Sequence, residues 1–264
     1  MPESVLQLKN LSCGYQDIVI LNGISLNCIK GDLIGIIGPN GSGKTTLLKV
    51  ISRILKPQGG ELLIEGEDLQ QISIQTIAQK IAVVTQFIDP VSIPVSDYIA
   101  MGRMPYFNKL QFFMNKRDQE IVDRYTTLTG SDRFHNKLMS EISGGERQLA
   151  QVARALAQEP VLMLLDEPTS HLDITHQIKI LDLIRRLNKN LKLTVIMVMH
   201  DLNLASEYCN RLVLLNQGGI YKEGTPHEVL TFEHLEDVYQ TPVIVEKNPL
   251  SGKPIALLVT EEEL

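Results

Sequence analysis

Cysteine is scarce in this sequence, which has three cysteines among 264 residues: Cys13, Cys28 and Cys209. No two of them form a C-x-x-C pair, and their spacing does not fit a metal site. We therefore expect three small, buried or half-buried apolar side chains in a reducing compartment rather than metal ligands.

Long hydrophobic runs are also missing. The longest apolar stretches, such as LTVIMVM at 193–199, are far shorter than the ~20 residues that a membrane-spanning helix needs. The N-terminal stretch MPESVLQLKN carries an early acidic residue and no apolar run, unlike a signal peptide. These absences predict a soluble chain whose role at a membrane would come through a partner.

Positive charge is in deficit, with 25 Lys and Arg against 31 Asp and Glu and a net charge of −6. This balance argues against a surface that coats nucleic acid. The chain is 44% hydrophobic and 21% charged, near the globular average, so a packed core is expected. The length suits one large domain, or a core with a smaller lobe. No internal repeat is visible, so each motif occurs once.

Strand-like and helix-like patterns alternate along the chain. Buried strands are expected at 32–38, 81–86, 161–166 and 193–199, and helices at 44–55, 147–158 and 174–188. Such alternation indicates a parallel sheet with crossover helices. Residues 88–158 are helical in pattern and indicate an inserted lobe. An antiparallel strand with one solvent face is expected within 18–29, and a hairpin within 243–260.

GPNGSGKT at residues 38–45 matches the pattern G-x-x-x-x-G-K-[ST]. It follows a predicted buried strand and opens a predicted helix, which is the context of a phosphate-binding loop. The glycines let backbone N–H groups wrap phosphates. Lys44 would reach the β- and γ-phosphates, and the Thr45 hydroxyl would bind Mg²⁺.

Two carboxylates, Asp166 and Glu167, end the predicted buried strand in VLMLLDEP. Parallel sheets bind ligands at the carboxyl ends of their strands. Asp166 is therefore expected to bind Mg²⁺ directly or through water, and Glu167 to orient or deprotonate an attacking water. The alternative is a solvated acidic turn before Pro168.

Three further polar or aromatic residues are weaker candidates on their own. His200 follows the strand at 193–199 and could lie beside a γ-phosphate, and Gln86 ends the strand at 81–86. Tyr15 could stack on adenine or pack on a sheet edge. Each also has an ordinary structural explanation.

EISGGERQ at 141–148 is a second candidate phosphate-binding device. Ser143 and Glu146 have the spacing of a capping box, a common helix start. Gly144 and Gly145 would let the backbone approach a ligand, and a helix N-terminus favours phosphate. From this stretch alone, the capping and the binding interpretations are equally good, and both can hold.

The order of these motifs resembles that of the nucleotide-binding subunit of ATP-binding-cassette (ABC) transporters. The phosphate loop is followed by Gln86, SGGE, LMLLDEP, SHLD at 170–173 and His200. The resemblance implies an α/β fold: a P-loop NTPase (RecA-like) core with an antiparallel β subdomain and an inserted α-helical subdomain. The implied boundaries are an ABC ATPase domain at 1–240 (core about 1–87 and 160–240, helical subdomain about 88–159) and a C-terminal β-hairpin extension at 241–264.

The resemblance also implies a role for each matching residue. Nucleotide contacts are implied for Tyr15, Gly38, Pro39, Asn40, Gly41, Ser42, Gly43, Lys44, Thr45, Thr46, Gln86, Ser143, Gly144, Gly145, Glu146 and Asp173. The implied catalytic residues are Glu167, His200 and Lys44, and the implied Mg²⁺ ligands are Thr45, Gln86 and Asp166. Two residues depart from the family pattern, since Ile142 replaces the commonest leucine and Glu146 the commonest glutamine. They preserve bulk and the capping partner.

Looser similarities point to importers of metal chelates, namely iron–siderophore, haem or cobalamin. They lie at 95–107, at 171–177, at 199–230 and in the tail at 241–257. The resemblance to ABC transporters as a whole implies an ATP hydrolase at the cytoplasmic face of the membrane, paired head to tail with a second copy. Integral membrane permease subunits and, indirectly, a substrate-binding protein are the implied partners, and nucleic acid is not. GRMP at 102–105 is expected where the family contacts the permease. An ABC exporter ATPase and a soluble, non-transport ABC ATPase are the alternatives.

Overall fold

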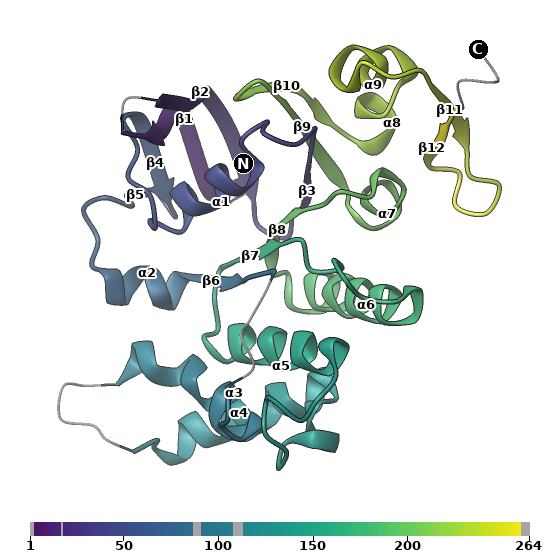
Figure 1. The fold of residues 1–264 in the computed structure, drawn as a ribbon. Coiled ribbons are helices and arrows are strands. Elements are labelled where there is room, and N and C mark those ends of the chain that lie inside the picture. The colour runs from purple at the N-terminus through teal and green to yellow at the C-terminus, as the bar shows by residue number, and fades with distance from the viewer. Residues whose placement is uncertain (1–2, 17, 87–90, 108–112, 260–264) are drawn as a thin grey trace. The chain divides into compact units, whose positions relative to one another are not determined.

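The computed structural model describes residues 3–16, 18–86, 91–107 and 113–259. The chain divides into two units, one made of Met1–Gln70 with Thr194–Leu264 and the other of Gln71–Leu193 (Figure 1). This division differs from the subdomain boundaries that the resemblance implies, and those boundaries stay a prediction.

An antiparallel sheet begins the first unit. Its strands are β1 (Ser4–Tyr15), β2 (Ile18–Ile29), β4 (Gly59–Ile64) and β5 (Glu67–Asp68), in the order β2-β1-β4-β5. In β2, Ile24, Leu26 and Cys28 are buried, whereas the residues between them are exposed. The expected strand with one solvent face is therefore confirmed.

Parallel strands form the second sheet region of this unit. They are β3 (Leu33–Ile37), β8 (Thr194–Val198) and β9 (Arg211–Asn216), with β10 (Gly219–Gly224) antiparallel to β9. β3 pairs with β8 on one side and with β9 on the other. All residues of β3 and β8 are buried, as predicted for 32–38 and 193–199. The loops that follow β3 and β8 consequently leave the same edge.

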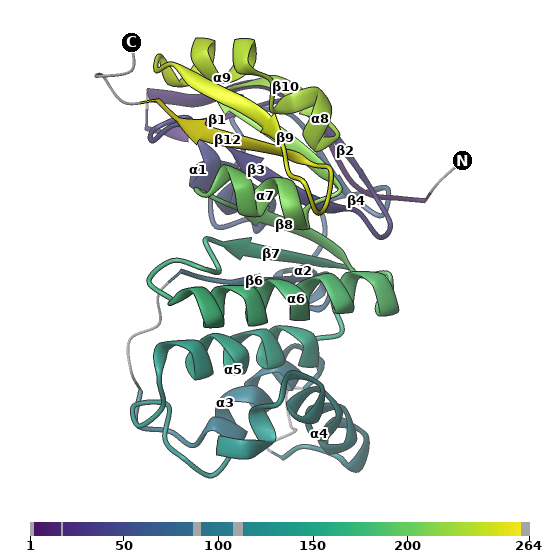
Figure 2. The ribbon, with the colours of Figure 1, turned by 90° about the vertical axis from the view of Figure 1, so that its right-hand side faces the viewer.

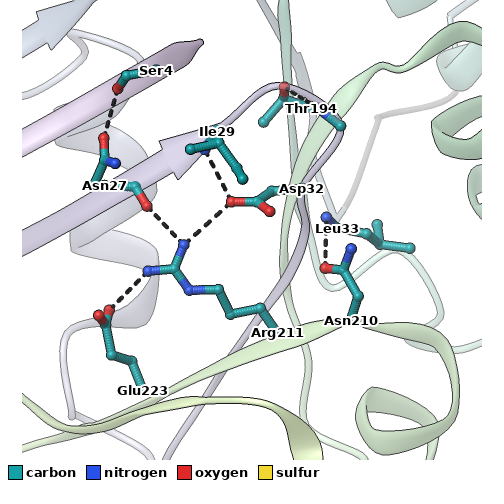
Figure 3. Close-up of polar contacts among 10 residues, drawn as sticks. Ser4, Asn27, Ile29, Asp32, Leu33, Thr194, Asn210, Arg211 and Glu223 are labelled. Atoms are coloured by element: carbon teal, nitrogen blue, oxygen red, sulfur yellow. Dashed lines mark hydrogen bonds and ion pairs between the residues drawn. The ribbon is translucent and has the colours of Figure 1, made fainter. Parts of the chain in front are cut away.

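A polar cluster around Arg211 joins β2, the turn before β3, and β10 (Figure 3). The Arg211 guanidinium donates to the Asn27 carbonyl at 2.7 Å and lies 3.2 Å from Asp32 Oδ2. It also lies 3.3 Å from a Glu223 carboxylate oxygen. Asp32 Oδ2 in turn accepts from the Ile29 N–H at 3.0 Å. This network anchors the start of β3, the strand that leads into the glycine-rich loop.

The remaining elements of the first unit are mainly helical. They are α1 (Lys44–Ile51), α7 (Leu202–Tyr208), α8 (Pro226–Val229), α9 (Phe232–Tyr239) and the hairpin of β11 (Val243–Lys247) with β12 (Pro254–Leu258). The helix predicted at 44–55 ends earlier, at Ile51, because Arg53 has a left-handed φ of 58° just past the helix end. β12 lies along α7, where the Asn203 amide exchanges hydrogen bonds of 3.1 and 2.8 Å with the Ala256 backbone (Figure 2).

The second unit contains one parallel strand pair and most of the long helices. Its strands are β6 (Ile81–Val84) and β7 (Leu162–Asp166). Its helices are α2 (Ile74–Lys80), α3 (Val95–Ala100), α4 (Lys116–Thr129), α5 (Gly144–Ala157) and α6 (Ile174–Leu191), with 3-10 turns η1 (Met101–Tyr106) and η2 (Ser131–Phe134). α5 lies between α6 and the α3–α4 pair (Figures 1 and 2). The strands and helices predicted at 81–86, 147–158, 161–166 and 174–188 are all present.

The GRMP segment at 102–105, expected to contact the permease, is partly buried in this structure. Arg103 is buried, and its guanidinium donates to Asp118 at 2.9 Å and to the Ala157 carbonyl at 2.7 Å. Gly102 is also buried, whereas the flanking Met101 and Met104 are exposed. The two methionines are therefore the most exposed side chains of this turn.

All three cysteines are free and buried, as predicted. Burial raises the pKa of the Cys28 and Cys209 thiols to about 12. Neither thiol is therefore ionised at neutral pH. Among the described helices, none combines the length and the apolar character that crossing a bilayer requires.

Candidate functional site

The glycine-rich loop joins β3 to α1 and is shaped by three glycines with positive φ. Gly38 has φ 145°, and a Cβ there would collide with the Leu215 carbonyl of β9. Gly43 has φ 101°, and its Cβ would lie 2.5 Å from Leu21. Gly41 has φ 81° but faces open space. The loop is therefore a cradle whose backbone can be built only with glycine at these positions.

Two buried polar side chains belong to this cradle. Lys44 is the first residue of α1 and is 7% exposed. Its ammonium donates to the Gly38 carbonyl at 2.9 Å and to the Pro39 carbonyl at 2.8 Å. The buried Ser42 hydroxyl has no hydrogen-bond partner among the described residues. A buried cation, an unsatisfied hydroxyl and an open backbone cradle together fit a phosphate group.

Tyr15 and His200 both lie in the same unit as this loop. Tyr15, the last residue of β1, is 43% exposed, and the ammonium of Lys49 on α1 lies 5.8 Å from its ring centroid. Ile36 of β3 pairs with Val198 of β8. His200 therefore follows β8 at the level at which Gly38 follows β3, on the same edge of the sheet.

Gln86 and Glu167 meet at the carboxyl edge of the other parallel pair, β6 and β7. Val84 pairs with Leu165, so each of the two side chains lies two residues beyond a paired position. The Gln86 amide donates to Glu167 Oε2 at 2.6 Å. The Ser170 hydroxyl donates to the same oxygen at 2.8 Å. Two neutral donors therefore hold the Glu167 carboxylate in one orientation.

The start of α5 has the predicted capping box. The Ser143 N–H donates to Glu146 Oε2 at 2.8 Å, and the Glu146 N–H donates to Ser143 Oγ at 3.3 Å. The bond from the Ser143 N–H holds the pKa of the Glu146 carboxyl below its usual value. The structural interpretation of this motif is therefore confirmed.

The two glycines of this motif have different surroundings. A Cβ on Gly145 would collide with the ring of His176 on α6. The exposed Gly144 has no positive φ, and a Cβ there would meet only Leu172, at 3.8 Å. Packing within this unit thus explains the glycine at 145 but not the one at 144.

Asp173 is linked to this helix start through the same histidine. It caps α6, since its Oδ1 accepts from the His176 N–H at 2.9 Å, and its Oδ2 lies 2.8 Å from His176 Nδ1. The bond from the His176 N–H lowers the pKa of the Asp173 carboxyl. His176 therefore contacts both Asp173 and Gly145, and its contact with Gly145 joins α6 to α5.

A sequence profile described as "ABC transporter" matches residues 21–170, which is more than half of the chain. The chain is also 39% identical to the probable siderophore transport system ATP-binding protein YusV of Bacillus subtilis, across 97% of this chain and 94% of that protein.

The chain belongs to the ABC transporter family of ATP-binding subunits.

Solved ABC structures share the fold. A metal-chelate type ABC transporter in an inward-facing conformation has a TM-score of 0.86 and 27% identity, across 99% of this chain and 100% of that one. The dimeric ATP-binding cassette MJ0796, bound to ADP and Pi after hydrolysis, has a TM-score of 0.70 and 29% identity. That match covers 83% of this chain and 98% of the cassette. The predicted ABC cassette fold is therefore confirmed.

Three contacts of the ABC motifs were not anticipated from the sequence. Ser170 donates to the Glu167 carboxylate, and the His176 ring packs against Gly145, as described above. In addition, the Gly38 N–H donates to the hydroxyl of Tyr239, at the end of α9, while burial raises the pKa of that hydroxyl to about 12. Spacing offered a signal for Ser170, which follows Glu167 by three residues, but nothing local marks the contact of Tyr239.

Proposed function

We propose that this chain is the ATP-binding subunit of an ABC importer that takes up a metal chelate, most specifically an iron–siderophore complex. The siderophore transport named for the Bacillus subtilis relative and the metal-chelate type of the structural neighbour support this choice. Both resemblances extend over nearly the whole chain, at 97% and 99% of its residues. Family membership makes the chain an ATP hydrolase that powers transport.

The observation that carries the nucleotide assignment is the buried Lys44 ammonium inside an open glycine cradle. In our proposal, the β- and γ-phosphates lie against the backbone N–H groups of 38–46 and accept from Lys44 and Ser42. Anion binding at the start of α1 is favoured by its free N–H groups and dipole. Tyr15, exposed at the end of β1 in the same unit, stacks on adenine.

The proposed metal ion is Mg²⁺, with Thr45, Gln86 and Asp166 as its protein ligands. Hydroxyl, amide and carboxylate oxygens are the donors that Mg²⁺ accepts, together with phosphate oxygens. Among the described residues, no cluster of three or more His, Cys, Asp or Glu side chains could hold a metal. In phosphoryl-transfer sites, Mg²⁺ is held by one or two carboxylates together with substrate phosphates. Once bound, Mg²⁺ would neutralise charge that develops on the phosphates.

Glu167 is the proposed base or orienting group for the attacking water. Its Oε2 is held by Gln86 and Ser170, so the other carboxylate oxygen has a defined direction. Hydrolysis of this kind depends mainly on positioning and electrostatics. His200 is proposed to contact the γ-phosphate, and its place at the carboxyl edge beside the loop supports that role.

A second copy of the chain is proposed to complete the site, head to tail. Gly144 supports this proposal because its own unit leaves space for a side chain there. A glycine in the first turn of a helix costs stability relative to alanine. Close approach of a ligand from outside the unit would explain why residue 144 is glycine. Ser143, Gly145 and Glu146 shape the same helix start. The ADP- and Pi-bound dimer of MJ0796 agrees with a dimeric arrangement for this chain.

Permease subunits are the proposed membrane partners, with the chain on the cytoplasmic face and a substrate-binding protein acting indirectly. Two exposed methionines, Met101 and Met104, offer an apolar surface beside the buried anchor Arg103. Methionine suits contact surfaces because its side chain adapts to its partner. We assign the permease contact to these methionines rather than to the whole GRMP turn.

Reconstitution tests the importer proposal. The chain is purified with its native membrane partners, placed in liposomes, and assayed for ATP hydrolysis with a binding protein loaded with a ferric siderophore. We expect stimulation by the loaded binding protein and little by the empty one. Co-purification with a cytosolic partner alone would contradict the transport assignment. Transport of the substrate from the cytoplasmic side of the membrane to the opposite side would instead identify an exporter.

A further inference from the structure

The second unit contains a groove that is largely separate from the proposed nucleotide site. Of the residues proposed to contact nucleotide, only Glu146 lines this groove, at its α5 end. Its volume is about 760 Å³. It is bounded by the C-terminal end of α4 with η2, by the start of α5, and by the length of α6. This volume falls within the range of small-molecule sites.

Positive charge dominates the lining of this groove. Its basic residues are Arg133, Lys179, Arg185, Arg186 and Lys189. The carboxylates in the lining are Glu146, which caps α5, and Asp182. Five cations against two carboxylates leave a local excess of three positive charges in a chain whose net charge is −6. His176 lies at the α5 end of the groove.

These cations are not neutralised by their surroundings. Within the part of the chain that the structure describes, no side chain of the five forms an ion pair or a hydrogen bond. Like charges this close repel one another unless an anion or solvent separates them. Exposed cations on one face of α6 could be explained by solvation alone. Arg133, however, comes from a different element and lines the same groove.

Apolar side chains form the floor beneath the basic rim. Phe134 and Leu183 are buried, and Leu149 is half-buried. Lys179 and Lys189 are ten residues apart on α6, which spaces them by ~15 Å along the helix axis. A concave apolar floor with several convergent polar groups is typical of a ligand pocket rather than of a solvated helix face.

We propose that this groove binds a small soluble molecule that carries several phosphate groups. Three of the five cations are arginines, whose forked guanidinium matches phosphate oxygens in pairs. The groove is enclosed by elements on three sides, which favours a compact polyanion over an extended chain. His176 and Glu146 place one end of the groove next to the start of α5. The proposal does not depend on the importer assignment.

Inositol hexakisphosphate serves as the probe, titrated calorimetrically into the full chain without Mg²⁺ at ~150 mM salt. We expect saturable binding to one site, with equal affinity in the wild type and in Lys44→Ala, because the groove is separate from the phosphate loop. The paired substitution Lys179→Glu/Arg186→Glu should weaken binding about a hundredfold, since each lost charged hydrogen bond costs roughly tenfold or more.

A matched pair controls for net charge. Lys116→Glu/Arg117→Glu changes the charge by the same amount at exposed positions on the first turn of α4, away from the groove. This pair should bind the probe like the wild type, and circular dichroism should match for all variants. A similar loss in both pairs would reduce the effect to general charge attraction and overturn the proposal.

Three other outcomes also overturn the proposal. Absence of binding at ~100 µM probe, which corresponds to a binding free energy weaker than about −5.5 kcal/mol, would mean that the groove is only a solvated surface. A loss of binding in Lys44→Ala would show that the probe binds at the phosphate loop rather than in the groove. Displacement of the probe by a glutamate oligomer of equal charge would favour an acidic protein segment as the ligand. A shift of the His176 ring resonance during the titration, by contrast, would place the probe in the groove.

Discussion

The two glycine-rich segments of this chain require their glycines for different reasons. In the loop after β3, positive φ angles and the close Leu215 carbonyl demand glycine at 38 and 43. At the start of α5, Gly144 has neither constraint. The loop is thus a complete cradle within its own unit. The helix start carries a glycine whose purpose lies outside that unit, as a site shared between two copies would require.

The largest test of this comparison is Glu167→Gln. Loss of the carboxylate base should lower ATP hydrolysis by about 10²- to 10⁴-fold, while ATP binding at the loop remains. If loop and helix start of two copies enclose one ATP, the variant should accumulate as a dimer in saturating ATP. Size-exclusion chromatography with light scattering measures this. A well-folded variant that stayed monomeric would contradict the composite site.

Ser170→Ala provides a graded companion to that substitution. It removes one of the two donors that orient the Glu167 carboxylate and leaves the base itself in place. We expect a smaller fall in kcat, about tenfold, since a hydrogen bond to a charged group contributes roughly 1.5 kcal/mol or more. An unchanged kcat would mean that Gln86 alone is sufficient to orient the base.

Lys44→Ala tests the loop half of the comparison. The ammonium donates to two loop carbonyls now and, in our proposal, to phosphates when ATP binds. Its removal should raise the Kd for ATP by about 10- to 100-fold, because hydrogen bonds to charged groups contribute ~1.5–3 kcal/mol. Lys9→Ala, an exposed lysine paired with Glu61 on the same unit, is the control and should leave the Kd unchanged. Equal affinity in both variants would remove Lys44 from the site.

Alanine substitution at each position in turn distinguishes the roles of the two glycines at the start of α5. Gly144→Ala should keep or slightly raise the Tm, because alanine favours the helix and has space. It should lower kcat about tenfold or more if the partner's phosphate approaches there. Gly145→Ala should instead lower stability by about 1–3 kcal/mol, because its methyl group collides with His176. Wild-type kcat in Gly144→Ala would show that nothing contacts this residue.

Sequence patterns predicted the buried strands well. β3, β7 and β8 each lie within one or two residues of their expected bounds, because a strand covered on both faces is an almost uninterrupted apolar run. β1 was not anticipated. Its pairing with β2 shifts register between Leu8 and Leu11 and again before Gly14, so its apolar alternation is broken by bulges. The end of α1 was also misplaced, since the left-handed φ of Arg53 has no residue signature.

The motifs of the site were visible in the sequence, but the contacts that position them were not. Glycine and lysine patterns mark a phosphate loop because the chemistry needs those residue types. The hydrogen bond between Tyr239 and Gly38 joins residues 201 positions apart, as the difference 239 − 38 shows. Such pairs arise from tertiary packing, and one sequence holds no local signal for them. The groove along α6 has the same origin.

The smallest expected effect concerns the cap of α5. The pKa of Glu146 is lowered in the folded state, chiefly by the Ser143 N–H. Its carboxylate therefore stabilises the fold fully above the ordinary pKa near 4.5, and this stabilisation is lost as the pH falls through the lower folded pKa. Glu146→Gln keeps an acceptor for the Ser143 N–H but cannot titrate. We expect its Tm at pH 7 to lie within a few degrees of the wild type, because one cap contributes about 1 kcal/mol or less.

Between pH 5 and pH 3, the Tm of Glu146→Gln should fall less steeply than that of the wild type. Glu141→Gln is the matched control, since Glu141 accepts from the Leu138 N–H at 2.9 Å without capping α5. Scanning calorimetry across this range measures the difference. Parallel Tm curves for Glu146→Gln and the wild type would mean that the cap does not depend on the charge. In that case glutamine and glutamate are interchangeable here for a structural reason: only an oxygen acceptor is needed to hold the helix start that carries Gly144.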